Sequence, residues 1–489
     1  MSQVREIPRV AEKEVRRAVV AAPVILRPRR SFISYKDAPW IVAIGDVVAL
    51  ATPLVLATSN LVSLEKNPGL TTILTVTAGI LLWLIFAGGL DLYSVALASS
   101  FKRTHRATLC AVLLVFAAKY VYIDPAETSL VLKYSYAVSA VLGVALWRTL
   151  FAAYTRAFPI SQRVLVVGAG SAGTLLAKAL RDKWNKGEAA YYLVGFVDDD
   201  PEKIGSERAG AYVHGSSRDV EALVDKYQVD TVALAINQEP VFNADVFNAF
   251  LDVREKGVRV VGMVALYEYV ARKVALSHVK HNWGITFTLE DMGNSFGYGP
   301  ASRALDIVTG VFGCIIVGLI SPFLMIANKF MSPGPLLYSQ LRVGKGGKPF
   351  RIYKFRSMIV NAEASGAVWA SEKDPRITKL GNFLRRTRLD ELPQFWNVLK
   401  GEMSLIGPRP ERPEFVEILA CKIPFYRARH AIKPGLTGWA QVMYRYGASE
   451  EDALTKLEFD LYYVKHRSLA LDLHILARSV VTVLTAAGR

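Results

Sequence analysis

Asp390 and Glu391 are adjacent acids in a part of the chain that is otherwise rich in cations. Arg385 and Arg388 come shortly before them, and Arg409 follows between two prolines. A carboxylate can attack phosphorus or hold Mg²⁺, and arginine side chains can neutralise phosphate oxygens. The spacing therefore favours phosphate chemistry, and the plainer alternative is a network of solvated ion pairs on the surface.

The same region contains three more segments that combine basic side chains with turn-forming residues, at 352–358, 406–410 and 433–441. Hydrophobic periodicity is weak from Tyr338 onward, while arginine, lysine and turn residues cluster. Two of the segments are predicted loops whose backbone is restricted by proline. A rigid loop can hold catalytic side chains in fixed positions relative to a substrate. These segments strengthen the expectation that the two acids belong to a built site.

The chain as a whole is long, apolar and basic. It has 489 residues, 52% of them hydrophobic, and a formal net charge of +16. At this length a mean hydropathy of +0.25 excludes a disordered protein and argues against a purely soluble one. The positive charge indicates an anionic partner, and nucleic acid, lipid phosphate and nucleotide all qualify. The three cysteines lack metal-ligand spacing, so neither a disulfide framework nor a zinc site is predicted.

The N-terminal part of the chain predicts a membrane bundle. Residues 1–39 form a basic cytoplasmic leader, and four apolar stretches follow it, at 40–62, 71–90, 107–123 and 131–154. Each stretch has about the length that a helix needs to cross a hydrocarbon core of ~30 Å. Basic residues flank both ends, so the positive-inside rule places both ends in the cytoplasm. We therefore expect a four-helix transmembrane bundle over 40–154.

Residues 161–275 predict a Rossmann-like α/β domain with a parallel sheet. A buried strand runs into Gly168, Gly170 and Gly173, a helical run follows, and three aspartates end the next strand. This order fits a dinucleotide-binding loop. Two interpretations stay open: a true nucleotide-binding site, and a degenerate nucleotide fold with a structural or regulatory role.

The apolar segment 306–327 is interrupted by Ser321 and Pro322. Basic residues lie on both sides of the segment, so both flanks are expected in the cytoplasm. Proline removes a helix hydrogen bond, and the Ser321 hydroxyl can satisfy a freed backbone group. We expect a re-entrant helix over 304–330 that bends at these residues and returns. The alternative is a kinked crossing helix, which would place the C-terminal domain outside.

From Arg303 onward the chain resembles the catalytic domain of bacterial polyprenyl-phosphate sugar-1-phosphate transferases, the phosphoglycosyl transferases. The resemblance runs through the Ser321-Pro322 hairpin and through motifs at 353–356, 389–399, 407–410, 434–441 and 459–463. With the bundle and the α/β domain in front, the chain is similar to the large members of that family over nearly its whole length. The resemblance implies a mostly helical catalytic domain over 303–489, after a linker at 276–302.

The resemblance also implies a two-step exchange. Asp390 would attack the β-phosphorus of a UDP-sugar, UMP would leave, and undecaprenyl phosphate would take the sugar-phosphate from the aspartate. Glu391 would complete the dyad as a metal or proton partner, and Mg²⁺ held by Asp390 and Glu391 would offset the repulsion between carboxylate and diphosphate. The residues implied at the phosphates or the substrate are Lys354, Arg356, Arg385, Arg388, Arg409, Arg445 and Asp460.

The same resemblance implies a multi-pass protein of the bacterial inner (cytoplasmic) membrane, with the catalytic domain on the cytoplasmic face. Its partners would be a UDP-sugar, undecaprenyl phosphate and inner-membrane lipid, with no nucleic acid, and the extra domains offer surface for a homodimer. Glucose-1-phosphate is the expected group transferred. The reaction would be the first step of exopolysaccharide or capsule repeat-unit assembly.

Two other functions compete with this one. A membrane-bound nucleotide-sugar dehydratase or epimerase using NAD needs a second Rossmann unit with a Tyr-x-x-x-Lys pair. Tyr269 and Lys273 match that spacing, but they lie at the end of the first α/β unit, and we interpret the match as chance. A non-enzymatic scaffold would only hold anionic lipid, and Asp390→Asn would leave that role intact.

Overall fold

The protein divides into two compact units, Met1–Ala271 and Arg272–Arg489. The computed structural model describes residues 33, 37–58, 108, 130–158, 160–186, 191–236, 244–276, 298–362, 374–444 and 449–484, and several positions between 77 and 93. The second and third predicted apolar stretches lie mostly outside the described residues, as does the basic leader. Each unit is therefore treated by itself.

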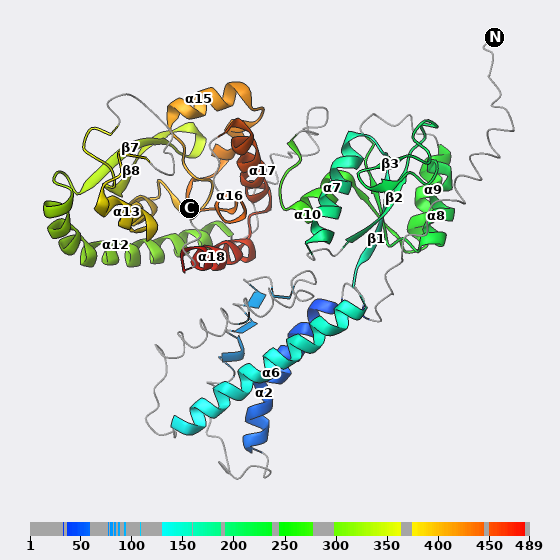
Figure 1. Ribbon diagram of the computed structural model, residues 1–489, viewed down its shortest axis with the longest axis horizontal. Helices are drawn as coiled ribbons and strands as arrows, with labels where there is room; N and C mark the ends of the chain where they lie inside the picture. Colours follow the sequence, from blue (N-terminus) through cyan, green and yellow to red (C-terminus); the bar gives the residue numbers. More distant parts are fainter. Residues whose placement is uncertain are drawn as a thin grey trace. The chain divides into compact units, whose positions relative to one another are not determined.

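Two apolar helices of the first unit lie side by side, α2 (Ala38–Thr58) and α6 (Leu130–Ala157) (Figure 1). They correspond to the first and fourth predicted stretches. Asp46 on α2 is buried and forms an ion pair with Arg148 on α6, and Trp83 Nε1 donates to the same carboxylate at 3.1 Å. A charged side chain in an apolar helix is costly unless it is paired, so this contact sets how α2 and α6 face each other.

The outer faces of both helices expose apolar side chains at a spacing of four residues, which places each set on one helix face. The exposed residues are Trp40, Ile44 and Val48 on α2, and Val138, Leu142, Leu146 and Leu150 on α6. By length and composition, Val138–Ala157 and the later helix Tyr298–Met331 could cross a membrane. These apolar faces are suited to lipid, and the protein associates with membranes.

The rest of the first unit is built on a four-stranded parallel sheet, as the βα alternation predicted. Its order is β2-β1-β5-β6, with β1 (Gln162–Val167), β2 (Tyr191–Val197), β5 (Thr231–Leu234) and β6 (Arg259–Gly262). The helices are α7 (Ser171–Asn185), α8 (Val220–Tyr227), α9 (Ala244–Glu255) and α10 (Met263–Ala271), and β3 (Glu207–Arg208) pairs with β4 (Ala211–Tyr212). Apolar side chains of the strands form one buried core with α8, because both sheet faces are covered.

The glycine-rich loop joins β1 to α7, and the fold itself requires two of its three glycines. Gly168 has a φ of +99°, and a Cβ on Gly173 would lie 1.9 Å from the Gly168 carbonyl oxygen. Gly170 has open space where its Cβ would be. The Asp198 carboxylate accepts the Ala169 N–H at 2.7 Å, so the loop is tied to the end of β2.

Substituting these glycines by alanine should therefore give unequal results. Gly173→Ala should lower the free energy of unfolding by about 1–3 kcal/mol, because the added methyl group displaces backbone. Gly170→Ala should cost under ~1 kcal/mol, the usual scale for a helix N-cap. Urea unfolding of the full-length protein, with hydrogen exchange of α7 peptides, measures both. Equal losses in the two variants would contradict this interpretation of the loop.

The second unit is mostly helical, as expected, with two small strand pairs. It contains α12 (Tyr298–Met331), α13 (Lys379–Arg386), η5 (Leu389–Glu391), α14 (Gln394–Lys400), α15 (Pro413–Lys422), η6 (Tyr426–Ala431), α16 (Trp439–Met443), α17 (Glu450–His466) and α18 (Leu469–Leu484). The strands are β7 (Leu337–Val343) paired with β8 (Pro349–Phe355), and β9 (Ser404–Ile406) paired with β10 (Gly435–Thr437). Val274 and Leu276 pack in the core of this unit, so the chain joins it earlier than the predicted start at 303.

The predicted bend at Ser321 and Pro322 lies inside a single helix, because α12 spans 34 residues with Pro322 within it, and its ribbon curves towards its C-terminal end (Figure 1). The re-entrant course of this helix in a membrane stays a prediction. The Ser321 hydroxyl donates to the Val317 carbonyl at 2.6 Å, which is a local bond to the preceding turn. Seven exposed apolar side chains recur every three or four residues along one face, namely Val308, Phe312, Ile315, Leu319, Phe323, Ile326 and Phe330. The helix therefore presents a continuous apolar stripe away from the protein.

The other face of α12 packs closely on the elements that carry the acids. Gly310 and Gly313 lie against α14, and a Cβ on Gly313 would meet the Phe395 ring at 2.1 Å. Buried Asp306 accepts a hydrogen bond from the Leu405 N–H of β9 at 2.7 Å. These contacts tie the apolar helix directly to α14 and β9.

Candidate active site

Asp390 and Glu391 lie in η5, a single tight turn between α13 and α14. Arg388 begins the turn in the left-handed conformation, with φ at 60°. That conformation reverses the chain after a helix and is strained for a residue other than glycine. Pro393 then enters α14 with its φ already helical. The helix–turn–helix therefore fixes the orientation of both acids.

Glu391 is surrounded by three cations from three separate segments. Its Oε1 accepts from Arg409 Nη2 at 2.8 Å and from Lys354 Nζ at 3.2 Å, and Arg388 lies 3.6 Å from Oε2. Burial by itself would raise the pKa of Glu391, but Arg409, Lys354 and Arg388 together hold it well below its usual range. Glu391 is therefore a carboxylate at neutral pH.

Asp390 is buried like Glu391, but its surroundings are less favourable to its charge. Burial raises the pKa of Asp390, the adjacent Glu391 charge adds to the effect, and Lys354 and Arg385 oppose it. Its Oδ1 has no hydrogen-bond partner among the residues that the structure describes. A buried carboxylate oxygen without a partner is costly and is free to bond to a substrate. Of the two acids, Asp390 therefore has the carboxylate oxygen that is available to an incoming group.

The surrounding cations are partly accessible from solvent. The side chains of Arg409 and Arg388 are 36% and 30% exposed, so an incoming phosphate can reach both. Lys354 on β8 is more buried, and burial lowers its pKa. The cluster is thus built to receive negative charge next to Asp390.

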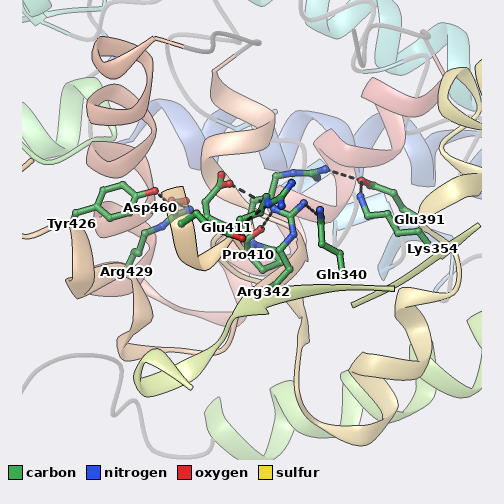
Figure 2. Close-up of polar contacts among 12 residues, drawn as sticks. Gln340, Arg342, Lys354, Glu391, Pro410, Glu411, Tyr426, Arg429 and Asp460 are labelled. Atoms are coloured by element: carbon green, nitrogen blue, oxygen red, sulfur yellow. Dashed lines mark hydrogen bonds and ion pairs between the residues drawn. The ribbon is translucent and has the colours of Figure 1, made fainter. Parts of the chain in front are cut away.

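The loop that carries Arg409 is held at its backbone by two guanidinium groups, that of buried Arg429 and that of half-buried Arg342 (Figure 2). Arg429 Nη2 donates to the Arg409 carbonyl at 3.0 Å, and Arg342 Nη1 donates to the Pro410 carbonyl at 3.1 Å. Arg429 also forms an ion pair with Asp460 at 2.7 Å. Arg409 is therefore anchored at its main chain while its side chain extends to Glu391.

Glycines bring the two proline-containing loops into contact. A Cβ on Gly435 would lie 2.0 Å from the Gly407 nitrogen, and one on Gly438 would lie 2.1 Å from the Gly407 oxygen. The Gly435 N–H donates to the Pro408 carbonyl at 2.9 Å. The predicted segments 406–410 and 433–441 therefore form one backbone platform for Arg409, because only glycine allows this approach.

The structure gathers most of the predicted site residues around the acids. The cations that act on them are Lys354, Arg385, Arg388 and Arg409. Arg356 is buried, and its guanidinium donates to the Pro335 carbonyl at 2.7 Å and to Asn328, so it holds the turn after α12. Asp460 is buried against Arg429. Arg445 lies outside the described residues.

Three residues at the site were not singled out from the sequence: Arg342, Gln394 and Arg429. Gln394 is buried at the start of α14, and no described residue forms a hydrogen bond with its Nε2. Arg342 and Arg429 are single basic residues outside the motifs named above. The spacing of these residues along the sequence does not indicate a site, because only tertiary contacts bring β7 and η6 to the loop that carries Arg409.

A divalent cation fits the donor atoms of this site only in part. The described residues contain no group of three or more His, Cys, Asp or Glu side chains placed to hold a metal. Asp390 Oδ1 is free, whereas Glu391 Oε1 already accepts two cationic donors. Mg²⁺ is commonly held by one or two carboxylates together with substrate phosphates, so this pair suits an ion that arrives with the substrate.

These features define a membrane-associated protein with a site of the kind that phosphoryl-transfer enzymes use. The bacterial sugar transferase family matches residues 298–486, which include α12, the two acids and the Arg409 loop. The chain belongs to this family of bacterial sugar transferases.

Curated relatives match the same part of the chain. A UDP-N-acetylgalactosamine-undecaprenyl-phosphate N-acetylgalactosaminephosphotransferase of Aeromonas hydrophila is 48% identical, over 39% of this chain and 45% of that protein. A UDP-glucose:undecaprenyl-phosphate glucose-1-phosphate transferase of Escherichia coli (strain K12) is 46% identical, over 36% of this chain and 39% of that protein. The exopolysaccharide production protein PSS of Rhizobium leguminosarum bv. phaseoli is 39% identical, over 37% of this chain and 94% of that protein. The match spans less than half of the first two proteins.

The α/β domain has a separate similarity. A CoA-binding domain matches residues 90–240, a range that includes the glycine-rich loop. Lys273 of the predicted Tyr-x-x-x-Lys spacing forms an ion pair with Glu458 of the second unit at 2.6 Å, while Tyr269 belongs to α10 of the first unit. The two residues thus belong to different units, and the interpretation of their spacing as chance stays a prediction.

Proposed function

We propose that this protein transfers a sugar-1-phosphate from a UDP-sugar to undecaprenyl phosphate, releases UMP, and so begins the assembly of an exopolysaccharide or capsule repeat unit. The observation that carries the proposal is Asp390, a buried carboxylate with an unpartnered oxygen among cations. The relatives are named for transfer to undecaprenyl phosphate, which supports the choice of acceptor.

In the first step a carboxylate oxygen of Asp390 bonds to the β-phosphorus of the donor. The bond from that phosphorus to the bridging oxygen breaks, and UMP leaves with the electron pair. Arg409, Arg388 and Lys354 lie where they can neutralise the phosphate oxygens as charge shifts. The product is an acyl phosphate that joins the sugar-phosphate to Asp390.

In the second step a phosphate oxygen of undecaprenyl phosphate attacks the same phosphorus. The bond to the Asp390 oxygen breaks, and the carboxylate returns to its free form with the sugar diphosphate lipid as product. Protein cations remain in place through both steps, so the site needs no rearrangement between them. Mg²⁺ bound by Asp390, Glu391 and the diphosphate would further offset the negative charge of the donor.

The apolar stripe of α12 suits an acceptor whose phosphate lies at the headgroup level. The packing of α12 on α14 and β9 couples the depth of this helix to the position of the acids. We propose that α12 enters one leaflet of the inner membrane and leaves the second unit on the cytoplasmic face. The donor would then come from the cytosol and the acceptor from the bilayer.

The relatives are named for N-acetylgalactosamine and for glucose, while the sequence expectation is glucose. Selection between epimers depends on a few hydrogen bonds to the sugar hydroxyls. We propose UDP-glucose as the first donor to test, with UDP-galactose and the N-acetylated sugars beside it.

The proposal is tested by incubating the membrane-extracted protein with undecaprenyl phosphate and each UDP-sugar while measuring UMP. One donor should give UMP and lipid-linked sugar diphosphate in equal amounts. Removal of Mg²⁺ with EDTA should reduce the rate by at least about 10²-fold, since carboxylate and diphosphate would then repel each other. Absence of UMP with every donor would refute the proposal, and full activity in EDTA would refute the role of the metal.

A further inference from the structure

Arg429 and Asp460 form a buried ion pair next to the site. Their side chains are 6% and 2% exposed, and Arg429 Nη2 lies 2.7 Å from Asp460 Oδ2. Arg429 Nη1 also donates to the Tyr426 hydroxyl at 2.7 Å. A buried ion pair gains little net stability, because desolvation offsets the attraction between the charges. The Arg429–Asp460 pair is therefore better explained by a role other than stabilising the fold.

The pair is connected to the acids through the main chain of one residue. The Arg429 nitrogen that binds Asp460 also donates to the Arg409 carbonyl at 3.0 Å, and the Arg409 guanidinium donates to Glu391 at 2.8 Å. Figure 2 shows these contacts extending from Asp460 towards Glu391. Arg429 therefore acts on Arg409 through one main-chain group, the Arg409 carbonyl.

The loop itself leaves little freedom at other positions. Pro408 and Pro410 have restricted φ angles, and Arg342 holds the Pro410 carbonyl from the opposite side. The main conformational freedom that remains lies at Arg409. A group that fixes the Arg409 carbonyl therefore also sets the direction in which its side chain leaves the loop.

We propose that Arg429 and Asp460 are positioning residues for Arg409, which they hold so that its guanidinium faces Glu391 and the donor phosphate. This inference rests on the proposed function where it names the donor phosphate. That Arg429 and Asp460 fix the position of Arg409 does not depend on the proposed function. On this proposal Asp460 holds Arg429, and Arg429 in turn fixes Arg409. Asp460 itself does not bind the substrate. The Arg429 guanidinium serves three acceptors at once, and a lysine lacks the planar fork needed for this.

The chain offers a matched control on the same helix. Glu458 lies two residues before Asp460 on α17, is likewise buried, and pairs with Lys273 at 2.6 Å. D460N and E458Q each remove one charge from a buried ion pair while keeping the shape of the side chain. D460N should lower kcat by about 10- to 100-fold, because small misplacement of a phosphate ligand is costly. E458Q should change kcat by less than about 3-fold at a similar loss in Tm.

A double-mutant cycle separates positioning from a general effect on the fold. If Asp460 acts through Arg409, adding D460N to R409Q should cost little beyond R409Q alone. The R429K variant should behave like D460N, with a lowered kcat and a similar loss in Tm. A D460N enzyme with the wild-type kcat, or losses that multiply in the double variant, would overturn the proposal.

Hydrogen exchange of peptides covering 404–416 supplies a readout that does not depend on activity. These peptides should exchange faster in D460N and R429K than in the wild type and in E458Q. Unchanged exchange in D460N would overturn the positioning role. If D460N and R429K exchange faster than the wild type but the wild type releases no UMP from any donor, the positioning role is retained and only the proposed function is refuted.

Discussion

Replacing Asp390 by asparagine should abolish UMP release and leave the protein at least as stable as the wild type. The amide cannot attack phosphorus, so turnover should fall by on the order of 10³-fold or more. Burial and Glu391 raise the pKa of Asp390, which means that the folded protein disfavours the ionised form. At neutral pH that charge therefore reduces stability, and the neutral asparagine removes the penalty. UMP assays and urea unfolding of the same preparation measure both quantities.

The covalent step gives a second readout for this variant. With donor alone, the wild type should gain the mass of one sugar-phosphate on a peptide containing Asp390, and Asp390→Asn should gain none. Asp472→Asn is the control, because Asp472 is buried but satisfied by hydrogen bonds from Tyr298 and Tyr463. That control should lose stability and keep UMP release in its folded fraction. An active Asp390→Asn variant would remove Asp390 from the mechanism.

Replacing the neighbouring Glu391 by glutamine should have the opposite effect on stability. Arg409, Lys354 and Arg388 lower the pKa of Glu391, so its negative charge contributes stability at neutral pH that is lost only on strong acidification. Its removal leaves three cations close together with no anion between them. We expect a loss of about 3–5 kcal/mol in unfolding free energy, the range for breaking a buried ion pair. Turnover should also fall by on the order of 10²-fold, because the cations lose their alignment.

Glu414→Gln is the control for this second prediction. Glu414 is 57% exposed and pairs with Arg412 at 3.5 Å, so its loss should change stability by less than about 0.5 kcal/mol. Urea unfolding of both variants beside Asp390→Asn provides the comparison. If Glu391→Gln unfolds at the same urea concentration as Asp390→Asn, the two acids do not differ in the way that their surroundings indicate.

Much of the fold could be predicted because its signals are local. Buried strands alternating with helical runs led to the parallel sheet of the α/β domain, and long apolar runs led to α2, α6 and α12. Pro322 does not divide α12 into two helices, because proline removes one backbone hydrogen bond and leaves the others of the helix in place. The start of the second unit was also predicted too late in the chain, at residue 303, since Val274 and Leu276 already pack in the core of that unit.

The sequence by itself determined which chemistry the site can carry out, because adjacent acids, nearby cations and the family motifs are encoded in short segments. The family resemblance assigned the attack to Asp390, but the spacing of the residues does not separate Asp390 from Glu391, since both are carboxylates in one turn. The tertiary structure made that distinction by bringing Arg409 and Lys354 to one acid and leaving an oxygen of the other without a partner. It also placed Arg429 and Asp460 behind Arg409. Charges respond to neighbours in space, and those neighbours come from segments far apart along the chain.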